Sequence, residues 1–309
     1  MLDHLHIQNY RLFKDLKIDK LGQVNLIAGK NNTGKTALLE ALRIYFSEGE
    51  GSVINNIIYK RGDWEVNRDF KMYSSLFPNK DMEEPKLIKI NNLSFGIADE
   101  LQKGYILYQI ENKRQISSMI SYENPLDNAI YIGIEITNEN NTKFWENISL
   151  TPKEDEVVNI IKILDSRISK IRIDNGNSKV LLNEEKFPIP LKNLGDGISR
   201  LLTLALALVN AKNKTLIIDE FEVGLHHSVQ EQLWDIIFKY AKEWNIQVFA
   251  TTHSQDTVKA FSYISSKEEY KDMGQYMRLQ PSRKTGEIEA VIYPQDSLEN
   301  SLDLNLETR

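Results

Sequence analysis

The alternation of hydrophobic and polar positions near the start of the chain predicts three strands in quick succession. Leu2 to Gln8 alternates as a half-buried strand does, and Leu16 to Asp19 repeats that pattern. Val24 to Ala28 is a third, more apolar run that stops at Gly29. From Lys35 to Phe46 the apolar positions recur at helical intervals, so we expect a helix shortly after the third strand.

The middle of the chain gives weaker signals. Residues 47–84 are polar and aromatic without a clear period, which predicts loops with short elements. Strand-like stretches return between 85 and 150, separated by turn-rich clusters such as Asn138 to Asn141. A helix is expected over Glu154 to Ile163, and a strand over Ile168 to Ile173.

The last third of the chain alternates strands with long apolar helices. Helices are expected over Gly197 to Val209 and Ser228 to Trp244, and strands over Thr215 to Ile218 and Gln247 to Thr251. This alternation is typical of a parallel sheet with crossover helices. Residues 276–309 add two strand-like runs and a polar amphipathic segment.

Composition narrows the class of protein without changing this picture. The chain has 309 residues, 41% hydrophobic and 27% charged, which is ordinary for a globular protein. Its net charge is −6, so it is not a polycationic protein, although a local basic groove is compatible with that balance. Cysteine is absent, which excludes disulfides, thiol nucleophiles and cysteine-based metal sites. No apolar run reaches the roughly 18 residues of a membrane span, so a cytoplasmic protein without a membrane partner is expected.

A phosphate-binding motif follows the third predicted strand. The pattern G-x-x-x-x-G-K-[ST] is matched at every fixed position, between an apolar strand and an apolar helix, which is its required setting. The glycines let backbone N–H groups surround phosphate oxygens, and the helix N-terminus adds its positive dipole end. Lys35 is expected to reach the β- and γ-phosphates of ATP, and Thr36 to coordinate Mg²⁺. The predicted nucleotide-binding residues are Gly29, Lys30, Asn31, Asn32, Thr33, Gly34, Lys35 and Thr36.

Two later strands end in residues that suit phosphate chemistry. Leu216 to Ile218 leads into Asp219 and Glu220, at the strand end where open α/β sheets bind ligands. Asp219 is predicted to hold Mg²⁺ through its water shell, and Glu220 to orient and deprotonate the attacking water. His253 also ends an apolar strand, and we expect it to donate a hydrogen bond to the γ-phosphate or to that water.

A glycine–acid–glycine turn precedes the helix expected from Gly197. Such a turn exposes backbone N–H groups to an anion, although read alone it is an ordinary helix start with Asp196 as its cap. The neighbouring histidines 226–227 point to different faces, which is poor metal geometry, so loop or helix-start roles are favoured for them. The residues of the glycine–acid–glycine turn are Leu194, Gly195, Asp196 and Gly197.

The order of these motifs resembles the ABC-type ATPase head shared by SMC proteins, RecF and the overcoming-lysogenization-defect (OLD) family. The loop ending at Thr36 is similar to their Walker A motif, and Asp219-Glu220 to their Walker B motif. Asn9 to Phe13 resembles their N-F-R-x-F strand end, which makes Arg11 a predicted nucleotide contact.

In the same comparison, Leu194 to Gly197 occupies the place of the signature motif, Gly224 to His226 that of the D-loop, and His253 that of the switch histidine. The stretch 194–261 looks especially like bacterial stand-alone ATPases of the OLD-related type. The family signature usually reads Leu-Ser-Gly-Gly, so Gly195 and Asp196 depart from it, and activation by a partner subunit is expected to rest on backbone N–H groups. The Q-loop glutamine stays open among Gln102, Gln109 and Gln115.

The resemblance implies an α/β P-loop NTPase: an ABC-ATPase-like head with a parallel core sheet, an N-terminal antiparallel β region and a mixed β and helical insertion. Residues 1–46 would form the first part of the ATPase core, 47–189 the insertion, and 190–309 the second part. Two heads would form a homodimer that sandwiches two ATP molecules. The signature residues of one subunit would then close over the γ-phosphate held by the other.

Several functions remain open for such a head. The OLD-type resemblance favours the ATPase subunit of a bacterial anti-phage or genome-maintenance complex with a separate Toprim-like nuclease, because only residues 254–309 follow the switch histidine. A RecF-like DNA-repair ATPase that clamps DNA is an alternative, and an ATP-gated scaffold with little turnover is another. The candidate DNA contacts are Lys162, Arg167, Lys170 and Arg172.

Overall fold

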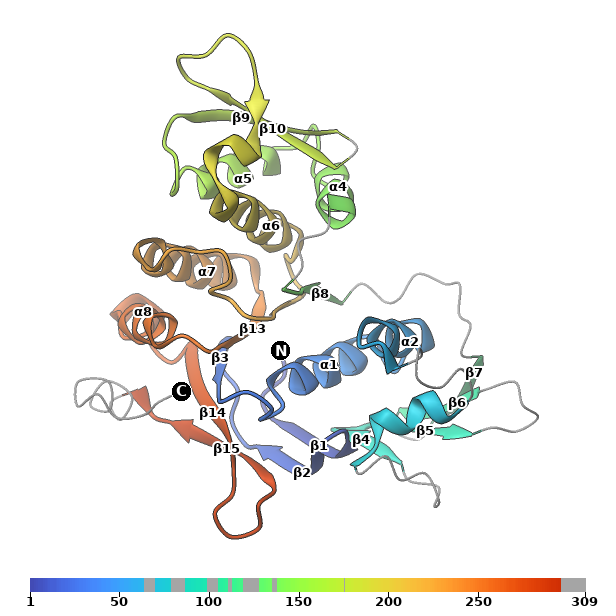
Figure 1. Ribbon diagram of the computed structural model, residues 1–309. Coiled ribbons are helices and arrows are strands. Elements are labelled where there is room, and N and C mark those ends of the chain that lie inside the picture. Colours follow the sequence, from blue (N-terminus) through green and yellow to red (C-terminus); the bar gives the residue numbers. More distant parts are fainter. Residues whose placement is uncertain are drawn as a thin grey trace. The chain divides into compact units, whose positions relative to one another are not determined.

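The computed structural model of the chain is shown in Figure 1. It describes residues 1–63, 70–78, 87–98, 105–110, 113–118, 128–134, 138–174 and 176–295. The chain forms two compact units, and each unit is assembled from separate stretches of sequence. Unit 1 comprises residues 1–21, 27–129 and 277–293, and unit 2 comprises residues 22–26, 130–276 and 294–309.

Unit 1 contains a six-stranded sheet that begins with the predicted amino-terminal strands. Strands β1 and β2 pair antiparallel, with Leu5 opposite Ile18 and Tyr10 opposite Phe13, and these four side chains are buried. The period-two pattern therefore fixes both the register and the buried face. The order in this sheet is β2-β1-β4-β5-β6-β7. Its strands are β1 (Leu5–Tyr10), β2 (Phe13–Ile18), β4 (Ile88–Ile90), β5 (Leu93–Ala98), β6 (Tyr105–Ile110) and β7 (Lys113–Ser118).

The helices of unit 1 follow the phosphate loop. Helix α1 (Lys35–Phe46) buries most of its side chains, including the apolar Leu38, Leu39 and Leu42. Helix α2 (Gly51–Lys60) and the 3-10 helix η1 (Phe70–Leu76) come next. The prediction of loops with short elements over 47–84 does not include the ten-residue helix α2. Its Asn55-Asn56 pair is a weak helix former, and burial of Ile54, Ile57 and Ile58 stabilises the helix instead.

A second six-stranded sheet has the order β15-β14-β3-β13-β12-β8. Strands β12 and β13 pair in parallel, with Leu216 opposite Val248, and both are buried along their whole length. The predicted parallel pairing and the antiparallel amino-terminal region are therefore both present. The strands of this sheet are β3 (Val24–Ala28), β8 (Ala129–Ile132), β12 (Thr215–Ile218), β13 (Gln247–Thr252), β14 (Gly274–Pro281) and β15 (Ile288–Tyr293).

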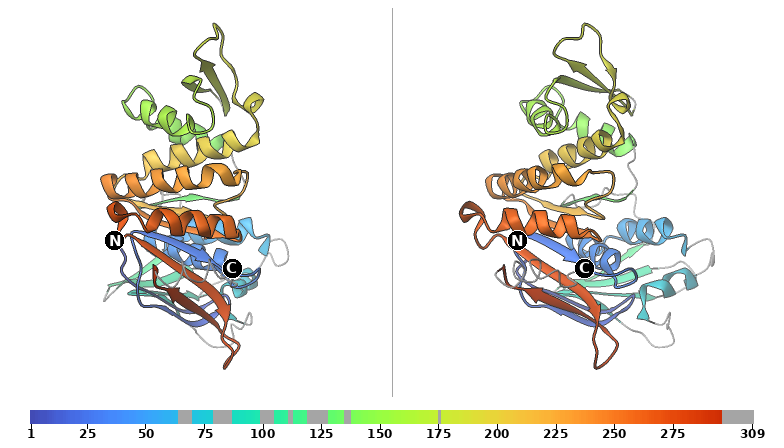
Figure 2. Two further views of the ribbon diagram at one scale, coloured as in Figure 1. Left: turned by 90° about the vertical axis from the view of Figure 1, so that its left-hand side faces the viewer. Right: turned by 60° about the vertical axis from the view of Figure 1, so that its left-hand side comes forward.

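Helices of unit 2 pack beside one another around an aromatic cluster. Both Figure 1 and Figure 2 show α7 (Gln230–Trp244) next to α8 (Gln255–Ser265). Trp234 of α7 stacks on Phe221 with ring centroids 4.1 Å apart and meets Phe261 of α8 edge-on at 5.1 Å. Such buried aromatic contacts stabilise a core beyond the area they remove from water. Short 3-10 helices, η4 (His227–Val229) and η5 (Glu268–Tyr270), lie before α7 and after α8.

The rest of unit 2 is a lobe of helices and a small sheet. Helix α5 packs against α6 and against β9, and the three-stranded sheet has the order β11-β10-β9. The prediction of a turn cluster over Asn138 to Asn141 is wrong: these residues start α4, and burial of Asn141 and Trp145 stabilises that helix. The elements are α4 (Asn138–Glu146), α5 (Lys153–Ile161), β9 (Ile168–Asp174), β10 (Asn177–Leu182), β11 (Ile189–Pro190), η3 (Leu191–Leu194) and α6 (Asp196–Asn210).

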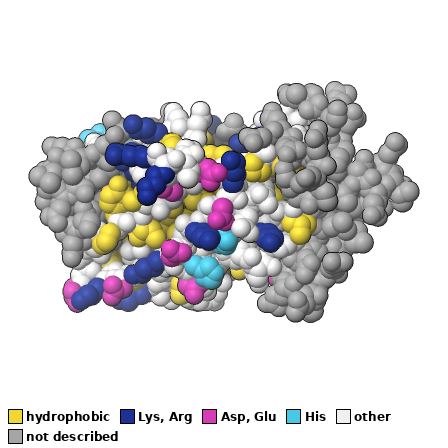
Figure 3. Space-filling view, turned by 90° about the horizontal axis from the view of Figure 1, so that it is seen from below, with side chains coloured by type: hydrophobic (Ala, Val, Ile, Leu, Met, Phe, Trp, Pro, Cys, Tyr) yellow, Lys and Arg dark blue, Asp and Glu magenta, His cyan; other side chains and the backbone are white. Residues whose placement is uncertain are grey.

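Charges of both signs share the face seen in Figure 3, where basic and acidic side chains are interspersed with hydrophobic ones. Contacts of β2 with its surroundings illustrate the same balance: Lys14 forms an ion pair with Glu287 at 3.1 Å, and His6 Nε2 contacts Asp15 Oδ1 at 2.5 Å. A separate question is whether any helix could cross a membrane. Among the described residues, no helix is long and apolar enough to do so.

Candidate functional site

The loop of residues 29–36 in unit 1, here called the phosphate loop after its sequence motif, has a backbone that only glycine suits at two positions. Gly29 and Gly34 have positive φ angles of 152° and 94°. A Cβ on Gly29 would lie 2.6 Å from Thr33 Oγ1 and 2.7 Å from the Leu279 carbonyl oxygen, and one on Gly34 would lie 2.7 Å from the Phe13 ring. The loop is therefore wound tightly enough that side chains at these positions are excluded.

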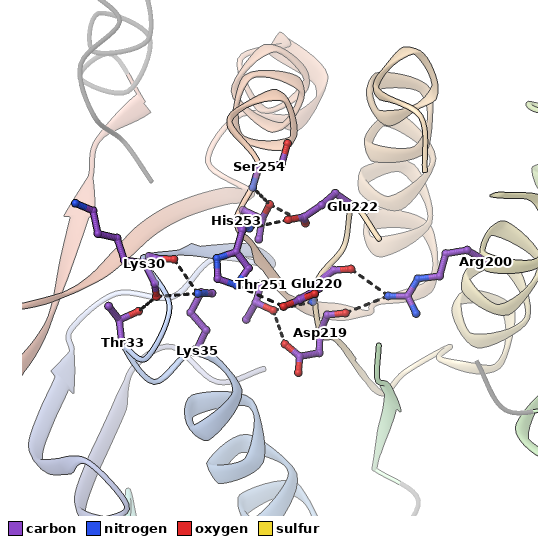
Figure 4. A network of polar contacts seen from close by, with 12 residues as sticks. Lys30, Thr33, Lys35, Arg200, Asp219, Glu220, Glu222, Thr251, His253 and Ser254 are labelled. Atoms are coloured by element: carbon purple, nitrogen blue, oxygen red, sulfur yellow. Dashed lines mark hydrogen bonds and ion pairs between the residues drawn. The ribbon is translucent and has the colours of Figure 1, made fainter. Parts of the chain in front are cut away.

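Polar side chains of the loop donate hydrogen bonds to backbone carbonyl oxygens of the same loop. Lys35 Nζ donates to the carbonyl oxygens of Gly29 at 2.7 Å and Lys30 at 3.1 Å, and Thr33 Oγ1 donates to the Lys30 carbonyl at 2.8 Å (Figure 4). No side chain caps the start of α1, where Gly34 is the N-cap and Thr36 is half-buried. An uncapped helix start behind a glycine loop is a ready anion-binding arrangement.

Arg11 lies in a buried ion-pair network in the same unit. Its Nε donates to Glu40 Oε2 at 2.7 Å, and Arg61 Nε donates to the other oxygen of Glu40 at 2.7 Å. Arg11 Nη1 also lies 3.5 Å from Asp63 Oδ2, while Nη2 is buried without a hydrogen-bond partner. Burial opposes the charge of Arg11, but Tyr10 and Glu40 outweigh it and raise its pKa. These contacts give Arg11 a structural partner in α1, and its nucleotide contact stays a prediction.

In unit 2, the chain after β12 is fastened to β13 through Thr251. Thr251 Oγ1 donates to Asp219 Oδ1 at 2.7 Å and accepts from the Glu220 backbone N–H at 2.9 Å. The Thr251 carbonyl accepts from the N–H of Phe221 at 2.9 Å. Asp219 is almost fully buried, and its backbone N–H donates to the Ile132 carbonyl at 2.8 Å. The predicted pair of carboxylates therefore sits on a rigid strand end.

Glu220 and His253 face one another across this strand end. Glu220 Oε1 lies 3.4 Å from His253 Nε2, with side chains 29% and 34% exposed, so both groups remain accessible to solvent. Glu220 has a φ of 48°, a left-handed conformation that is uncommon for a residue other than glycine. Such strain persists only where the surroundings impose it, and it gathers at functional sites. The predicted base and the predicted switch histidine are thus brought together within unit 2.

Sequence reasoning missed Arg200, which fixes the other side of the Asp219–Glu220 backbone. The Arg200 side chain is buried, and its Nη2 donates to the Asp219 carbonyl at 3.0 Å and to the Glu220 carbonyl at 3.2 Å. Its Nη1 donates to the Gly133 carbonyl at 2.6 Å. Burial lowers the pKa of Arg200 against the opposing pull of Asp219. In the sequence Arg200 is an arginine one turn into an apolar helix, a pattern too common to identify its role.

The signature-like residues lie at the start of α6, which Arg200 joins to this strand end. Leu194 ends η3, and Gly195 is the exposed N-cap of α6 with a φ of 103°. Asp196 is the first helical residue rather than the cap expected for it. A Cβ on Gly197 would lie 2.8 Å from the carbonyl oxygen of Gly224, so α6 packs tightly on that loop.

Two further histidines follow Gly224. His226 Nδ1 contacts Ser228 Oγ at 2.9 Å, and the rings of His226 and His227 lie 4.1 Å apart. His226 also caps η4, in line with the helix-start role favoured for it. Within the described ranges, no group of three or more histidine or acidic side chains is arranged to hold a metal ion.

The chemistry of these groups fits a nucleotide with Mg²⁺. The Gly29–Thr36 loop has the uncapped helix start and the lysine that phosphates require, and Thr36 and Asp219 are oxygen donors of the kind Mg²⁺ prefers.

Comparison with known families defines the class of the protein. Residues 1–156 match the family described as "AAA ATPase domain", and residues 89–258 match the family described as "AAA domain, putative AbiEii toxin, Type IV TA system". Each match spans about half of the chain or more, and the chain belongs to the AAA ATPase domain family.

Individual relatives refine that placement. An ATP/GTP phosphatase of Helicobacter pylori is 23% identical over 337 aligned positions, which cover 87% of this chain and 90% of that protein. The DNA replication and repair protein RecF of Lactobacillus acidophilus is 56% identical over 45 residues, 15% of this chain and 12% of RecF. The Pyrococcus furiosus Smc head domain, solved with an extended coiled coil and the C-terminal domain of ScpA, superposes with a TM-score of 0.55 at 12% identity, covering 98% of each chain. The predicted α/β fold of an ABC-type, SMC-like ATPase head is confirmed.

Proposed function

We propose that this protein binds ATP with Mg²⁺ and hydrolyses it to ADP and phosphate. The observation that carries the proposal is the Gly29–Thr36 loop, in which two glycines leave no room for side chains and Lys35 lies within the loop. Backbone N–H groups of such a loop surround phosphate oxygens, and the lysine neutralises their charge. The H. pylori relative, named an ATP/GTP phosphatase, supports hydrolysis of a nucleoside triphosphate.

The proposed chemistry assigns each remaining residue one task. Thr36 and Asp219 would hold Mg²⁺, which would neutralise charge on the phosphates. Thr251 Oγ1 donates to Oδ1 of Asp219, and Oδ2 would be the oxygen that serves the metal's water shell. Glu220 accepts a proton from the attacking water, and His253, 3.4 Å from it, donates a hydrogen bond to that water or to the γ-phosphate.

Turnover and binding measured on the same preparations test this proposal. The purified protein should release phosphate from ATP, and chelation of Mg²⁺ should stop it. Glu220→Gln should lower kcat by about 10²–10⁴-fold and keep ATP binding, because the amide cannot accept the proton. Lys35→Ala should lose binding itself. A Glu220→Gln variant with the parental rate contradicts the assigned base, and ATP binding without turnover favours the scaffold alternative.

We further propose that ATP brings two copies of the chain together. The signature-like turn supports this, because Gly195 is exposed and precedes an α6 start with no side-chain cap. Glu220→Gln, which keeps ATP bound, should shift the protein from monomer to dimer in light scattering when ATP and Mg²⁺ are added. A monomer under those conditions, with ATP bound, contradicts the proposed ATP sandwich.

The proposed setting is a bacterial anti-phage or genome-maintenance complex with a separate Toprim-like nuclease. The resemblance to OLD-type heads supports an effector partner, and so does the description of one matched family, which names a toxin of a type IV toxin–antitoxin system. The related Smc head was solved with a domain of ScpA, and this supports a protein partner for the present chain as well. Co-purification from the native host, with identification of the bound protein, tests this setting.

DNA clamping is the second candidate, favoured by the RecF match and by one surface of unit 2. Lys170 and Arg172 lie on the exposed face of β9, and Lys179 of β10 pairs directly opposite Arg172. Against this, Arg167 is paired with Asp165 at 2.7 Å and Arg172 with Asp174 at 2.7 Å, which reduces the local positive charge. ATP-dependent duplex binding that falls with salt and with Lys170→Glu would support this candidate.

A further inference from the structure

The carboxylate of Glu222 holds the turn that carries His253. Glu222 Oε1 accepts from the backbone N–H of His253 at 2.7 Å, and Oε2 accepts from Thr252 Oγ1 at 2.8 Å. Figure 4 shows this contact together with Glu220 and Ser254. Both oxygens of this half-buried carboxylate are thus engaged by two consecutive residues, Thr252 at the end of β13 and His253 directly after it. Hydrogen bonds to a charged acceptor are the stronger kind.

The same turn is continued into α8 by neighbouring hydroxyl groups. Thr252 Oγ1 accepts from the Ser254 backbone N–H at 3.0 Å, and Ser254 Oγ caps α8 by accepting from the Thr257 N–H at 3.3 Å. His253 lies between these two bonded residues. Its backbone is therefore held at its own N–H by Glu222 and on its C-terminal side by the helix cap.

Glu222 also belongs to the segment that carries the predicted base. That segment is tied to β13 at successive residues: Asp219 and Glu220 to the hydroxyl of Thr251, then Phe221 to its carbonyl. Glu222 extends this series of hydrogen bonds to Thr252 and His253, the two residues that follow Thr251. The 3.4 Å separation of Glu220 Oε1 and His253 Nε2 is consequently set from both ends by this series of bonds.

We propose that Glu222 is a positioning residue that holds His253 against Glu220 during ATP hydrolysis. The inference rests on the proposed ATPase function and adds to it a residue that does not touch the nucleotide. Glu222 stands two residues before Gly224, whose carbonyl packs against Gly197 at the start of α6. Glu222 therefore also connects the signature-like helix start with the turn that carries His253.

Replacing Glu222 separates hydrogen-bond geometry from charge. Glu222→Ala removes both acceptors, and kcat should fall by about 100-fold with KM for ATP little changed, since a misplacement of about 1 Å costs that much. Glu222→Gln keeps an oxygen for the His253 N–H and offers its NH₂ group to Thr252 Oγ1, so it should stay within about threefold of the parental kcat. Glu231→Ala, which removes an exposed acidic side chain from the first turn of α7, is the matched control and should not change kcat.

A second measurement does not depend on turnover. Hydrogen exchange of the His253 amide should accelerate at least tenfold in Glu222→Ala and stay near the parental rate in Glu222→Gln, because only the alanine variant loses the acceptor. If the parental protein fails to hydrolyse ATP, the proposed function fails, whereas this amide still reports whether Glu222 holds the turn.

Three results would overturn the inference. The first is a Glu222→Ala protein with the parental kcat, and the second is unchanged protection of the His253 amide in that variant. The third is a Glu222→Gln protein as slow as Glu222→Ala, because charge rather than position would then be the cause. If Glu222→Ala does not fold, Thr252→Val removes one of the two Glu222 contacts together with the acceptor of the Ser254 N–H and should also lower kcat, whereas Thr252→Ser keeps the hydroxyl for both and should restore the rate.

Discussion

Thr251 Oγ1 and Asp219 Oδ1 are 2.7 Å apart in the buried end of the β12–β13 pair, and the same hydroxyl accepts the N–H of Glu220. One side chain on β13 thereby fixes the direction of the predicted metal ligand and the backbone of the predicted base. A buried hydroxyl that both donates and accepts cannot be replaced by an apolar group without leaving two polar partners unpaired.

Removing that hydroxyl should therefore lower the free energy of unfolding by more than the loss of one small group would suggest. Thr251→Val keeps the shape of the side chain but leaves the Asp219 carboxylate and the Glu220 N–H without it. We expect a loss of about 1–3 kcal/mol in the free energy of unfolding, measured by urea denaturation. Thr251→Ser retains the hydroxyl and should lose clearly less. Equal losses for the two variants would show that methyl packing, not the hydrogen bonds, dominates.

The two glycines Gly34 and Gly62 separate backbone strain from steric exclusion. Both have positive φ, 94° and 72°, but a Cβ on Gly34 would meet the Phe13 ring at 2.7 Å, whereas one on Gly62 meets nothing within 4 Å. Gly62→Ala should cost about 1–2 kcal/mol for left-handed backbone alone. Gly34→Ala should cost a further 1–3 kcal/mol, roughly, and weaken ATP binding, because the ring or the loop must move. Thermal melts and nucleotide titration of both variants provide the comparison.

Because Arg11 and Glu40 form a buried ion pair, the losses in unfolding free energy caused by substituting each of them should not add up in the double variant. Glu40→Ala leaves buried Arg11 with the Ser75 carbonyl at 3.2 Å and with Asp63 as its nearest carboxylate at 3.5 Å, and it removes the carboxylate partner of Arg61. We expect a loss of about 3–5 kcal/mol in denaturant unfolding, the usual cost of breaking a buried pair from one side. The double variant Arg11→Met with Glu40→Leu should recover much of it. Additive losses would contradict a coupled pair.

Acid stability should depend on Arg167. Its hydrogen bonds to Asp165 lower the pKa of that carboxyl below its ordinary value. A lowered pKa in the folded state stabilises the fold at pH values above the unfolded pKa of about 3.9, and this contribution disappears as the pH falls through the folded pKa. Arg167→Ala should raise the pKa of Asp165 in a carbon-detected NMR titration and flatten the pH dependence of stability below about pH 4. An unchanged titration would rule out the pairing in solution.

Much of the fold could be predicted from local pattern because its strongest signals come from strongly periodic segments. The strands leading to Gly29, Asp219 and His253 are short apolar runs bounded by polar residues, and their predicted bounds agree with β3, β12 and β13 to within a residue. Helices α2 and α4 were not predicted, because their asparagines favour turns. Their helical conformation is decided by burial against residues that are distant in the sequence. Tertiary contacts of that kind leave no trace in a single window of sequence.

The residues of the candidate site also fall into two groups, those that the sequence reveals and those that only the fold reveals. The phosphate loop, Asp219, Glu220 and His253 are identifiable because their chemistry requires particular residues at fixed spacing. Arg200 and Glu222 are not, since an arginine in a helix and a glutamate in a loop occur throughout any protein. Only the fold shows that Arg200 donates to the carbonyls of the Asp219–Glu220 segment and that Glu222 holds the backbone of His253.

The interleaved division of the chain has a consequence for how the molecule is made. Unit 1 takes its last stretch from residues 277–293, and unit 2 takes its first from residues 22–26, so the boundary between them falls inside the fully buried strand β3. During synthesis the amino-terminal half emerges long before the strand residues that complete it. Unit 1 can form only after segments that lie more than 250 residues apart in the sequence, 1–21 and 277–293, have both been synthesised, which favours slow, late folding over stepwise folding during synthesis.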